Sequence, residues 1–437
     1  MSSPLPRPTR QSATDAAFAF FLVALAVSLF RAADLPALDV GVGGTSLSIG
    51  PVDVALLVTA VLAARRLRQG GAVPSAPLVA ATSAFAVLIA ASAIPNSPDA
   101  IAAAGKLAEL AVLPVAVVAF VDTRRRFDLL GTFLVGFCGV ATAWGVVEFV
   151  ADSGKRQGSF MGEHDLAALA TMALVLGLAN LFAHERRPPA IALAGLAVGG
   201  LGVVIGASLA SVLGLYLATA TLIGLAAARG RLRRRAVVAA LVTCAAVTAA
   251  TYGIRSADLG FLQAWFGPPP ETPGQYAASW SQRLIFVYIG GRVFLDNPVL
   301  GTGWEGELPP ADYAQYLPDA RQRFSDQPFH YFPQEDETLI PQQTYDQVLF
   351  ELGLVGAALF ALLAALAVRH ALVAARRPPP GAPWAEQAFL PLAWLASLAG
   401  ALAGAALFGG SPLAALFWLS LGVAGAGAAL ARREAAA

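Results

Sequence analysis

Long apolar segments recur along most of the chain and are separated by shorter polar segments. A continuous apolar segment of about 20 residues is long enough to cross a lipid bilayer as an α-helix. Because these segments do not alternate with polar residues, they argue against the strands of a membrane β-barrel. We therefore predict an all-α polytopic membrane protein with about 12 transmembrane helices, at residues 15–33, 47–64, 76–94, 101–121, 127–150, 164–183, 189–206, 208–228, 236–254, 346–369, 386–407 and 411–431.

The polar segments between the predicted helices alternate between basic and non-basic. Loops rich in Lys and Arg are retained in the cytoplasm, and most of the 29 Lys and Arg residues lie in every second loop or in the two terminal segments. Because both terminal segments are basic, both are predicted to lie in the cytoplasm, and the chain must then cross the membrane an even number of times. This favours twelve helices over eleven or thirteen. The basic loops read RRLRQGG, DTRRRFD, HERRPP, ARGRLRRR and RHALVAARRPPPG.

One predicted external connection, residues 255–345, is far longer than the others and separates the first nine helices (1–254) from the last three (346–437). A loop of this length within a compact protein usually has a function. Its segment SWSQRLIFVYIGGRVFLDNP has apolar residues at helical spacing, which predicts an amphipathic helix on the membrane surface or against the bundle. The segment ADYAQYLPDARQRF predicts a second, short polar helix.

Composition agrees with a membrane protein, since 57% of the residues are hydrophobic and 13% are charged, whereas soluble domains have about 25% charged residues. The formal net charge of +1 gives no general attraction to nucleic acid. Cys138 and Cys244 lie inside apolar segments, which predicts buried small side chains rather than a disulfide. The 4 histidines have no spacing typical of metal ligands, so neither a metal nor a cofactor is predicted.

Charged residues inside apolar segments are costly, and they therefore mark candidate sites. Lys106 and Glu109 lie one helical turn apart in the fourth predicted helix. Mutual neutralisation of the two side chains is the structural interpretation. A site for a lipid head group is the functional alternative.

Basic residues on the predicted external side run against the enrichment of Lys and Arg in cytoplasmic loops, so they are candidate functional residues. The planar guanidinium of arginine can bind phosphate oxygens. Arg156 lies in a short external loop, and Arg283 and Arg292 lie on the amphipathic helix. Residues nine positions apart on a straight helix point to opposite sides, so these last two are not expected to hold one phosphate together. The alternative for each is a side chain that reaches the phosphates of membrane lipids. The other external basic residues are Arg31, Lys155, Arg255, Arg321 and Arg323.

Three patterns between residues 150 and 370 resemble the O-antigen ligase and O-antigen polymerase superfamily of bacterial membrane glycosyltransferases. RQGSFMGEHDLAAL is similar to the family's Arg-x-Gly-x-Phe turn before a helix. RLIFVYIGGRVFLDNPVLGTGW matches its Arg, apolar helix and Asn/Glu-x-Pro-x-x-Gly-x-Gly. QQTYDQVLFELGLVGAALF resembles its His-Asn-x-Tyr-Leu-Gln…Glu-Leu-Gly-Leu-x-Gly.

The resemblance implies a GT-C-like fold and a metal-independent enzyme in a bacterial inner membrane. Such an enzyme transfers a glycan from a polyprenyl (undecaprenyl) diphosphate carrier to a sugar hydroxyl on the external face. Its partners are the lipid-linked donor, a glycan or glycolipid acceptor and membrane lipids, and Arg156, Arg283 and Arg292 would bind the donor phosphates. A ligase and a polymerase both fit. A glycolipid transporter and a non-catalytic scaffold are the alternatives, although the repeated halves common in transporters are not visible.

The chain departs from the family pattern at two places. Gln342 and Gln343 stand where the family has His-Asn, and glutamine can orient a hydroxyl or a phosphate but cannot act as a general base. The turn at which the family often has an arginine reads GASLASVLG, with Ser208 and Ser211. The catalytic candidates are therefore Arg283, Gln342, Gln343 and His330, and the further candidates for the base are Glu335, Asp336, Glu337 and Asp346. The alternative is that no base is needed, because diphosphate leaves readily once the substrates are positioned and its charge is stabilised.

The segment LIPQQTYDQ places several hydrogen-bonding side chains where the tenth predicted helix begins. We expect Tyr345 and Asp346, with Glu335 and Glu337, to line an acceptor cavity at the outer membrane face. Polar groups are tolerated there because they face water and substrate. The alternative is helix capping at the membrane surface, with Tyr345 among the interfacial aromatic residues.

Overall fold

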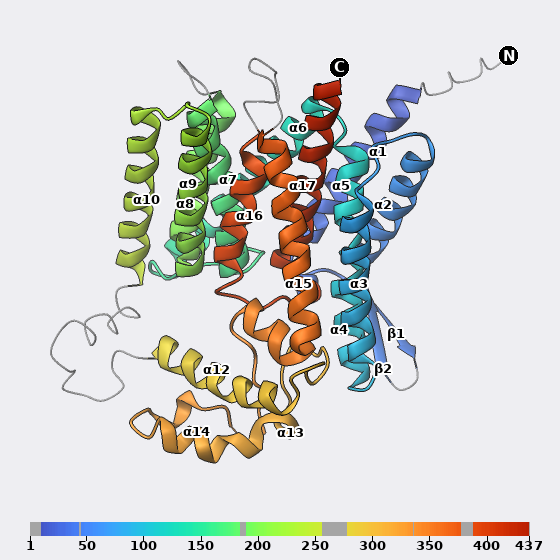
Figure 1. Cartoon of the computed structure of the whole chain (residues 1–437). Coiled ribbons are helices and arrows are strands. Elements are labelled where there is room, and N and C mark those ends of the chain that lie inside the picture. Colours follow the sequence, from blue (N-terminus) through green and yellow to red (C-terminus); the bar gives the residue numbers. More distant parts are fainter. Residues whose placement is uncertain are drawn as a thin grey trace.

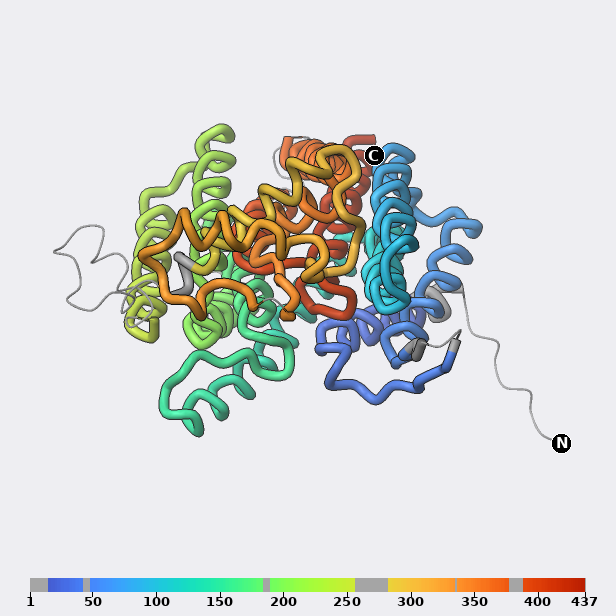
Figure 2. Tube along the Cα trace, turned by 90° about the horizontal axis from the view of Figure 1, so that it is seen from below, coloured from blue at the N-terminus to red at the C-terminus, as the bar shows by residue number. Residues whose placement is uncertain are grey.

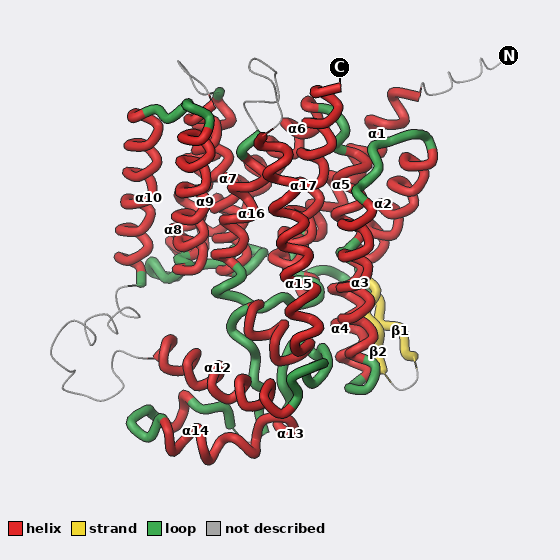
Figure 3. The backbone as a smooth tube through the Cα atoms, in the orientation of Figure 1, coloured by secondary structure: helices red, strands yellow, loops and turns green. Residues whose placement is uncertain are grey.

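The computed structural model describes residues 10–42, 45–183, 189–255, 278–334, 336–376 and 388–436. Most of the described helices run side by side in one bundle, and a smaller group of helices covers one end of it (Figures 1 and 3). The bundle helices are α1 (Arg10–Ser28), α2 (Pro51–Arg68), α3 (Ala76–Ala93), α4 (Pro98–Glu109), α5 (Val112–Phe120), α6 (Arg124–Ala151), α7 (Glu163–Ala183), α8 (Ala190–Gly206), α9 (Leu209–Ala228), α10 (Arg234–Ile254), α15 (Thr344–Arg376), α16 (Leu390–Ala401) and α17 (Pro412–Ala436).

Eight helical segments in the described part of the chain are long and apolar enough to cross a membrane, and one of them, Pro98–Phe120, combines α4 and α5. They are Ala76–Ala93, Pro98–Phe120, Arg124–Ala151, Glu163–Ala183, Leu209–Ala228, Arg234–Ile254, Thr344–Arg376 and Pro412–Ala436. Three apolar helices are shorter, at Asp15–Ser28, Ala190–Gly206 and Leu390–Ala401. These helices agree with an all-α polytopic membrane protein, whereas twelve crossings and a GT-C arrangement stay predictions.

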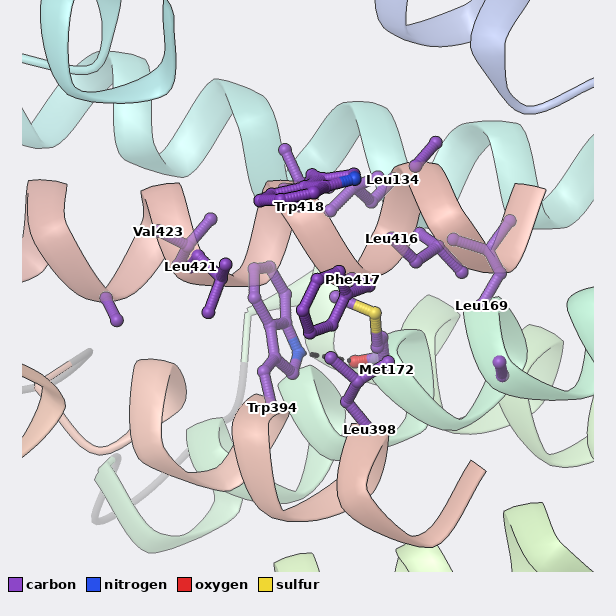
Figure 4. Close-up of a cluster of buried hydrophobic side chains, with 14 of the residues drawn as sticks. Leu134, Leu169, Met172, Trp394, Leu398, Leu416, Phe417, Trp418, Leu421 and Val423 are labelled. Atoms are coloured by element: carbon purple, nitrogen blue, oxygen red, sulfur yellow. Dashed lines mark hydrogen bonds between the residues drawn. The ribbon is translucent and has the colours of Figure 1, made fainter. Parts of the chain in front are cut away.

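The centre of the bundle is formed by α7 and α17, whose apolar segments are almost entirely buried. Phe417 of α17 packs beside Trp394 of α16 and Met172 of α7 (Figure 4). The Trp394 indole N–H donates a hydrogen bond of 2.8 Å to the Met172 carbonyl, so its polar atom is satisfied inside the core. The packing of this core fixes the ends of α7, α16 and α17, where the polar residues of the candidate site lie.

Several predicted transmembrane segments differ from the observed helices. Segment 101–121 divides into α4 and α5, because Pro114 has no N–H to donate to the carbonyl four residues earlier. Segment 346–369 lies in the longer helix α15, whose backbone is non-helical at Gly353. Segment 386–407 contains the shorter helix α16, and residues 402–411 form a loop that we call the α16–α17 loop.

A β-hairpin, which the hydrophobic pattern did not predict, occupies the start of predicted helix 47–64. Strand β1 (Leu38–Val42) pairs antiparallel with β2 (Thr45–Ile49). The following helix α2 therefore begins only at Pro51. Proline suits this first helical position because it needs no hydrogen-bonded N–H there.

The charge on Lys106 is neutralised from a neighbouring helix. Lys106 of α4 forms its ion pair with Asp53 of α2, rather than with Glu109 as expected. The same Asp53 accepts a hydrogen bond of 2.5 Å from the Gly50 N–H. This carboxylate therefore ties the start of α2 to α4.

The long connection between α10 and α15 forms a helical unit with its own hydrophobic core. We call residues 278–334 and 336–343 the α12–α14 subdomain, and Figure 2 shows it lying across the end of the bundle. It contains α12 (Ala278–Asp296), α13 (Pro310–Tyr313), α14 (Leu317–Arg323) and the 3-10 turns Ala314–Tyr316 and Phe329–Tyr331. The first predicted helix is confirmed as α12, whereas the second is divided into α13 and α14 by a 3-10 turn. Its core also includes Phe350 of α15 and is thereby anchored to the bundle; the other members are Ile285, Ile289, Val293, Leu308, Tyr313, Leu317, Ala320, Tyr331, Phe332 and Leu339.

Candidate functional site

The turn after α12 docks onto the break in α15. At Gly353 φ is 59° and ψ is −157°, a conformation essentially restricted to glycine. The break frees the N–H groups of Leu354 and Val355, which donate to the carbonyls of Pro298 and Val299 at 2.9 and 3.1 Å. The patterns NPVLGTGW and FELGLVG, far apart in the sequence, therefore form one structural unit.

A buried glutamate strengthens this unit. Glu351 is fully buried, and its carboxylate accepts hydrogen bonds from the N–H groups of Glu305 and Gly306, both at 3.2 Å. Its own carbonyl accepts a hydrogen bond of 2.9 Å from the Gly303 N–H. Glu351 thus holds the segment after α12, a role that the sequence analysis did not assign although the residue lies in a quoted motif.

The polar residues at the start of α15 hold the α16–α17 loop. The Thr344 hydroxyl donates to the Ala405 carbonyl at 2.8 Å. The buried Gln347 amide donates to the Leu407 carbonyl at 3.0 Å and accepts from the Leu407 N–H at 2.8 Å. The Tyr345 hydroxyl donates to the Ala399 carbonyl of α16 at 2.7 Å. Much of the polarity at this helix start therefore satisfies backbone groups of a neighbouring loop and helix.

A cavity of about 600 Å³ opens beside this loop, between the ends of α1, α6 and α7. Asp165 in its wall accepts a hydrogen bond of 2.7 Å from the Leu413 N–H, so this carboxylate holds the start of α17. Arg31 donates to the Met161 carbonyl at 2.9 Å. The polar lining consists of Arg31, Glu148, Gln157, Ser159, Glu163, His164, Asp165 and Ser411.

Three arginines from different elements converge at this end of the bundle. Burial, and then the charges of Arg255 and Arg156, lower the pKa of the Arg283 guanidinium, while the Asp346 carboxylate acts in the opposite direction. Arginine nevertheless stays charged in proteins. Arg156, Arg255 and Arg283, which we call the arginine cluster, thus concentrate positive charge beside two carboxylates, those of Asp346 and Glu163.

His164 joins the arginine cluster to the cavity. It lies within electrostatic reach of all three guanidinium groups and also lines the cavity. Its Nδ1 lies 3.2 Å from the Ser208 hydroxyl oxygen, at the start of α9. The neighbouring Glu163 forms a salt bridge of 2.8 Å with Arg156. Neither a role for His164 nor its contact with Ser208 was predicted, because residues 164 and 208 are distant in the sequence and share no local pattern.

Arg255 brings positive charge to the turn between α8 and α9, where the sequence lacks the family's arginine. Its Nη1 donates to the Ala207 carbonyl at 3.3 Å. Ala207 has the left-handed backbone conformation, with φ 43° and ψ 40°. Arg255, at the end of α10, therefore supplies an arginine to the α8–α9 turn, which has none of its own.

Other predicted site residues make their contacts within the α12–α14 subdomain. Arg292 forms an exposed salt bridge of 2.8 Å with Asp319, and His330 is exposed and packs edge-on against Tyr331. The Glu337 carboxylate accepts from the Gln334 N–H at 3.4 Å.

The two glutamines lie just before α15 and are partly buried. The Gln342 amide donates to the Ile340 carbonyl at 3.1 Å, and the Gln343 carbonyl accepts from the Gln347 N–H at 3.0 Å. Glu335 lies outside the described residues. Within the described ranges, no three His, Cys, Asp or Glu side chains are grouped so that they could hold a metal ion.

Comparison with known proteins gives one family. Residues 160–361 match the family model described as O-antigen ligase. The match includes all three motifs in large part, the α12–α14 subdomain and the break in α15. No curated protein matches the chain.

Proposed function

Because residues 160–361 form a domain of the O-antigen ligase family, we propose that this protein transfers a glycan from a polyprenyl diphosphate carrier to a sugar hydroxyl. The observation that carries the proposal is the convergence of Arg156, Arg255 and Arg283 beside a polar cavity. This site lies at the end of the bundle away from the basic loops. The charge bias of the loops assigns that end to the external face of a bacterial inner membrane.

The arginine cluster is the proposed site for the donor diphosphate. Guanidinium groups bind phosphate oxygens with paired, charge-assisted hydrogen bonds. As the glycosyl bond breaks, negative charge builds up on the leaving diphosphate, and fixed positive charges stabilise it without reorganisation. Arg283 is central because it is flanked by the other two arginines and by Asp346. Arg292 is exposed and forms its salt bridge with Asp319 inside the α12–α14 subdomain, outside the arginine cluster, so we assign it no part in this role.

The cavity between α1, α6, α7 and the α16–α17 loop is the proposed acceptor site. Its volume of about 600 Å³ lies within the range of about 300–1,000 Å³ that is typical of ligand sites. Its lining offers an arginine, an amide and carboxylates, which are the partners that sugar hydroxyls need. Thr344 and Gln347 would act indirectly, because they hold the loop that closes one side.

His164 is the proposed general base, in the role that the family gives to the histidine replaced here by Gln342. In the proposed step the acceptor oxygen bonds to the anomeric carbon while the bond from that carbon to the phosphate oxygen breaks. The acceptor proton passes to His164, and the diphosphate leaves with the bonding electron pair. We assign His164 the tautomer whose Nδ1–H donates to the Ser208 hydroxyl oxygen, which leaves Nε2 to accept this proton. No metal takes part in this scheme.

Transfer by purified protein, from an undecaprenyl diphosphate-linked glycan, tests the proposal. Arg283→Ala should abolish transfer while expression and thermal unfolding stay normal. The matched control is Arg292→Ala, which removes an arginine from the same helix and should retain transfer. Normal transfer by Arg283→Ala would exclude the proposed donor site. The length of the product distinguishes a single ligation from polymerisation.

A further inference from the structure

A larger cavity lies at the opposite end of the bundle, between α1, α2 and α6. Its volume is about 830 Å³. One part of its wall is apolar and is formed by Phe18, Ala19, Leu22 and Leu129. The remaining wall carries the charged and polar residues Asp15, Arg66, Asp122, Thr123, Arg125 and Arg126.

The carboxylates of Asp122 and Asp15 form salt bridges with two of these arginines, Arg66 and Arg126. Arg66 and Arg126 both form salt bridges with Asp122, at 2.7 and 2.9 Å. Arg126 also pairs with Asp15 at 2.8 Å. The Asp122 carbonyl accepts a further hydrogen bond of 3.1 Å from Arg433 of α17. This network fixes the guanidinium groups at the polar end of the cavity.

At the polar end of this cavity, the arginine charges and N–H donors exceed the carboxylates available to pair with them. The cavity wall contains three arginines and two aspartates. Arg125 is exposed and has no salt bridge in the part of the chain that the structure describes. The Nε atom of Arg66 is buried without a hydrogen-bond acceptor. An unpaired arginine and an unused N–H donor at the same cavity are suited to an added anion.

We propose that this cavity binds an anionic phospholipid, with its phosphate at Arg66 and Arg125 and an acyl chain against Phe18, Leu22 and Leu129. The apolar wall favours a lipid over a soluble phosphate compound, because a soluble compound would leave that wall exposed. The charge bias of the loops places the site in the cytoplasmic leaflet, which is the anionic surface that basic pockets between membrane helices recognise. The lipid would join α1, α2 and α6, and the proposal does not rest on the proposed transfer activity.

Native mass spectrometry of the delipidated full-length protein in non-ionic detergent tests this site. The probes are phosphatidylglycerol, phosphatidylcholine as the zwitterionic reference, and inorganic phosphate as a soluble competitor. Arg125→Gln removes the unpaired arginine, and Arg65→Gln, an exposed arginine of α2 outside the cavity wall, is its control. Ala19→Trp fills the apolar part, and Ala16→Trp on the same helix is the corresponding control.

We expect phosphatidylglycerol to bind more tightly than phosphatidylcholine. Arg125→Gln should weaken phosphatidylglycerol binding about fivefold, the usual effect of one arginine near an anionic head group. Ala19→Trp should remove the tight binding, and both controls should retain it. Equal binding of the two lipids, or equal loss in Arg125→Gln and Arg65→Gln, would overturn the proposal. Displacement of the lipid by millimolar inorganic phosphate would instead identify a soluble phosphate ligand and would also overturn it.

Discussion

Replacing Gly353 with alanine tests whether the break in α15 positions the α12–α14 subdomain. The backbone there has φ 59° and ψ −157°, and a non-glycine residue in such a region costs about 1–3 kcal/mol. An added Cβ would also lie 2.6 Å from the Val299 carbonyl and 2.7 Å from the Gly301 nitrogen, so the turn after α12 must move away. The two hydrogen bonds from Leu354 and Val355 are then lost. At about 0.5–1.5 kcal/mol each, the total cost is about 2–6 kcal/mol.

This cost falls on the contact between α15 and the turn after α12, whereas the bundle core around α7 and α17 keeps its packing. The variant should therefore insert into membranes with normal helical content. The amides of residues 298–303 should exchange hydrogen faster than in the wild type. Transfer should fall at least tenfold, because α12 no longer holds Arg283 beside Arg156; this corresponds to a loss of about 1.4 kcal/mol in transition-state stabilisation.

The control for this experiment is Gly291→Ala on α12. An added Cβ at Gly291 has no atom within 4 Å, and alanine is a better helix former than glycine by about 0.5–1 kcal/mol. This variant should be as active as the wild type and at least as stable. Wild-type exchange and wild-type transfer in Gly353→Ala would refute the idea that the break positions the subdomain.

Three other substitutions test separate parts of the site. His164→Ala should lower the transfer rate about 10²–10⁴-fold, the usual contribution of a general base, while His330→Ala should not; equal initial rates in the two variants would contradict the proposed base. Arg292→Ala should leave donor affinity unchanged in a titration with lipid-linked glycan, and a marked loss would extend the donor site along α12. Gln347→Leu should leave the N–H and carbonyl of Leu407 unpaired, at about 1–3 kcal/mol each, so thermal unfolding should begin at a lower temperature; an unchanged midpoint would show that the loop is held by other contacts.

The hydrophobic pattern predicts the helices well and their interruptions poorly. Helices such as 76–93 and 190–206 lie within a residue or two of their predicted positions, because a long apolar segment in a membrane has few alternatives to a helix. The interruption at Gly353 could not be predicted from hydropathy. It depends on hydrogen bonds to the turn after α12, about 50 residues earlier in the sequence.

The candidate site was predictable only where a local pattern marked it. Arg156, Arg283 and Asp346 were recognised from motifs and from charge that opposes the expected bias, and the structure brings them together. His164 and Arg255 join them from α7 and from the end of α10. Arg255 carried the same charge signal and His164 lies in the motif RQGSFMGEHDLAAL. Neither could be placed at the site from the sequence, because the bundle core brings these helix ends together.

A structure of the protein with bound undecaprenyl diphosphate would show whether the arginine cluster holds the donor. We expect the diphosphate to lie among Arg156, Arg255 and Arg283, with His164 facing the adjoining cavity. A diphosphate bound beside Arg292, or at the opposite end of the bundle, would contradict it.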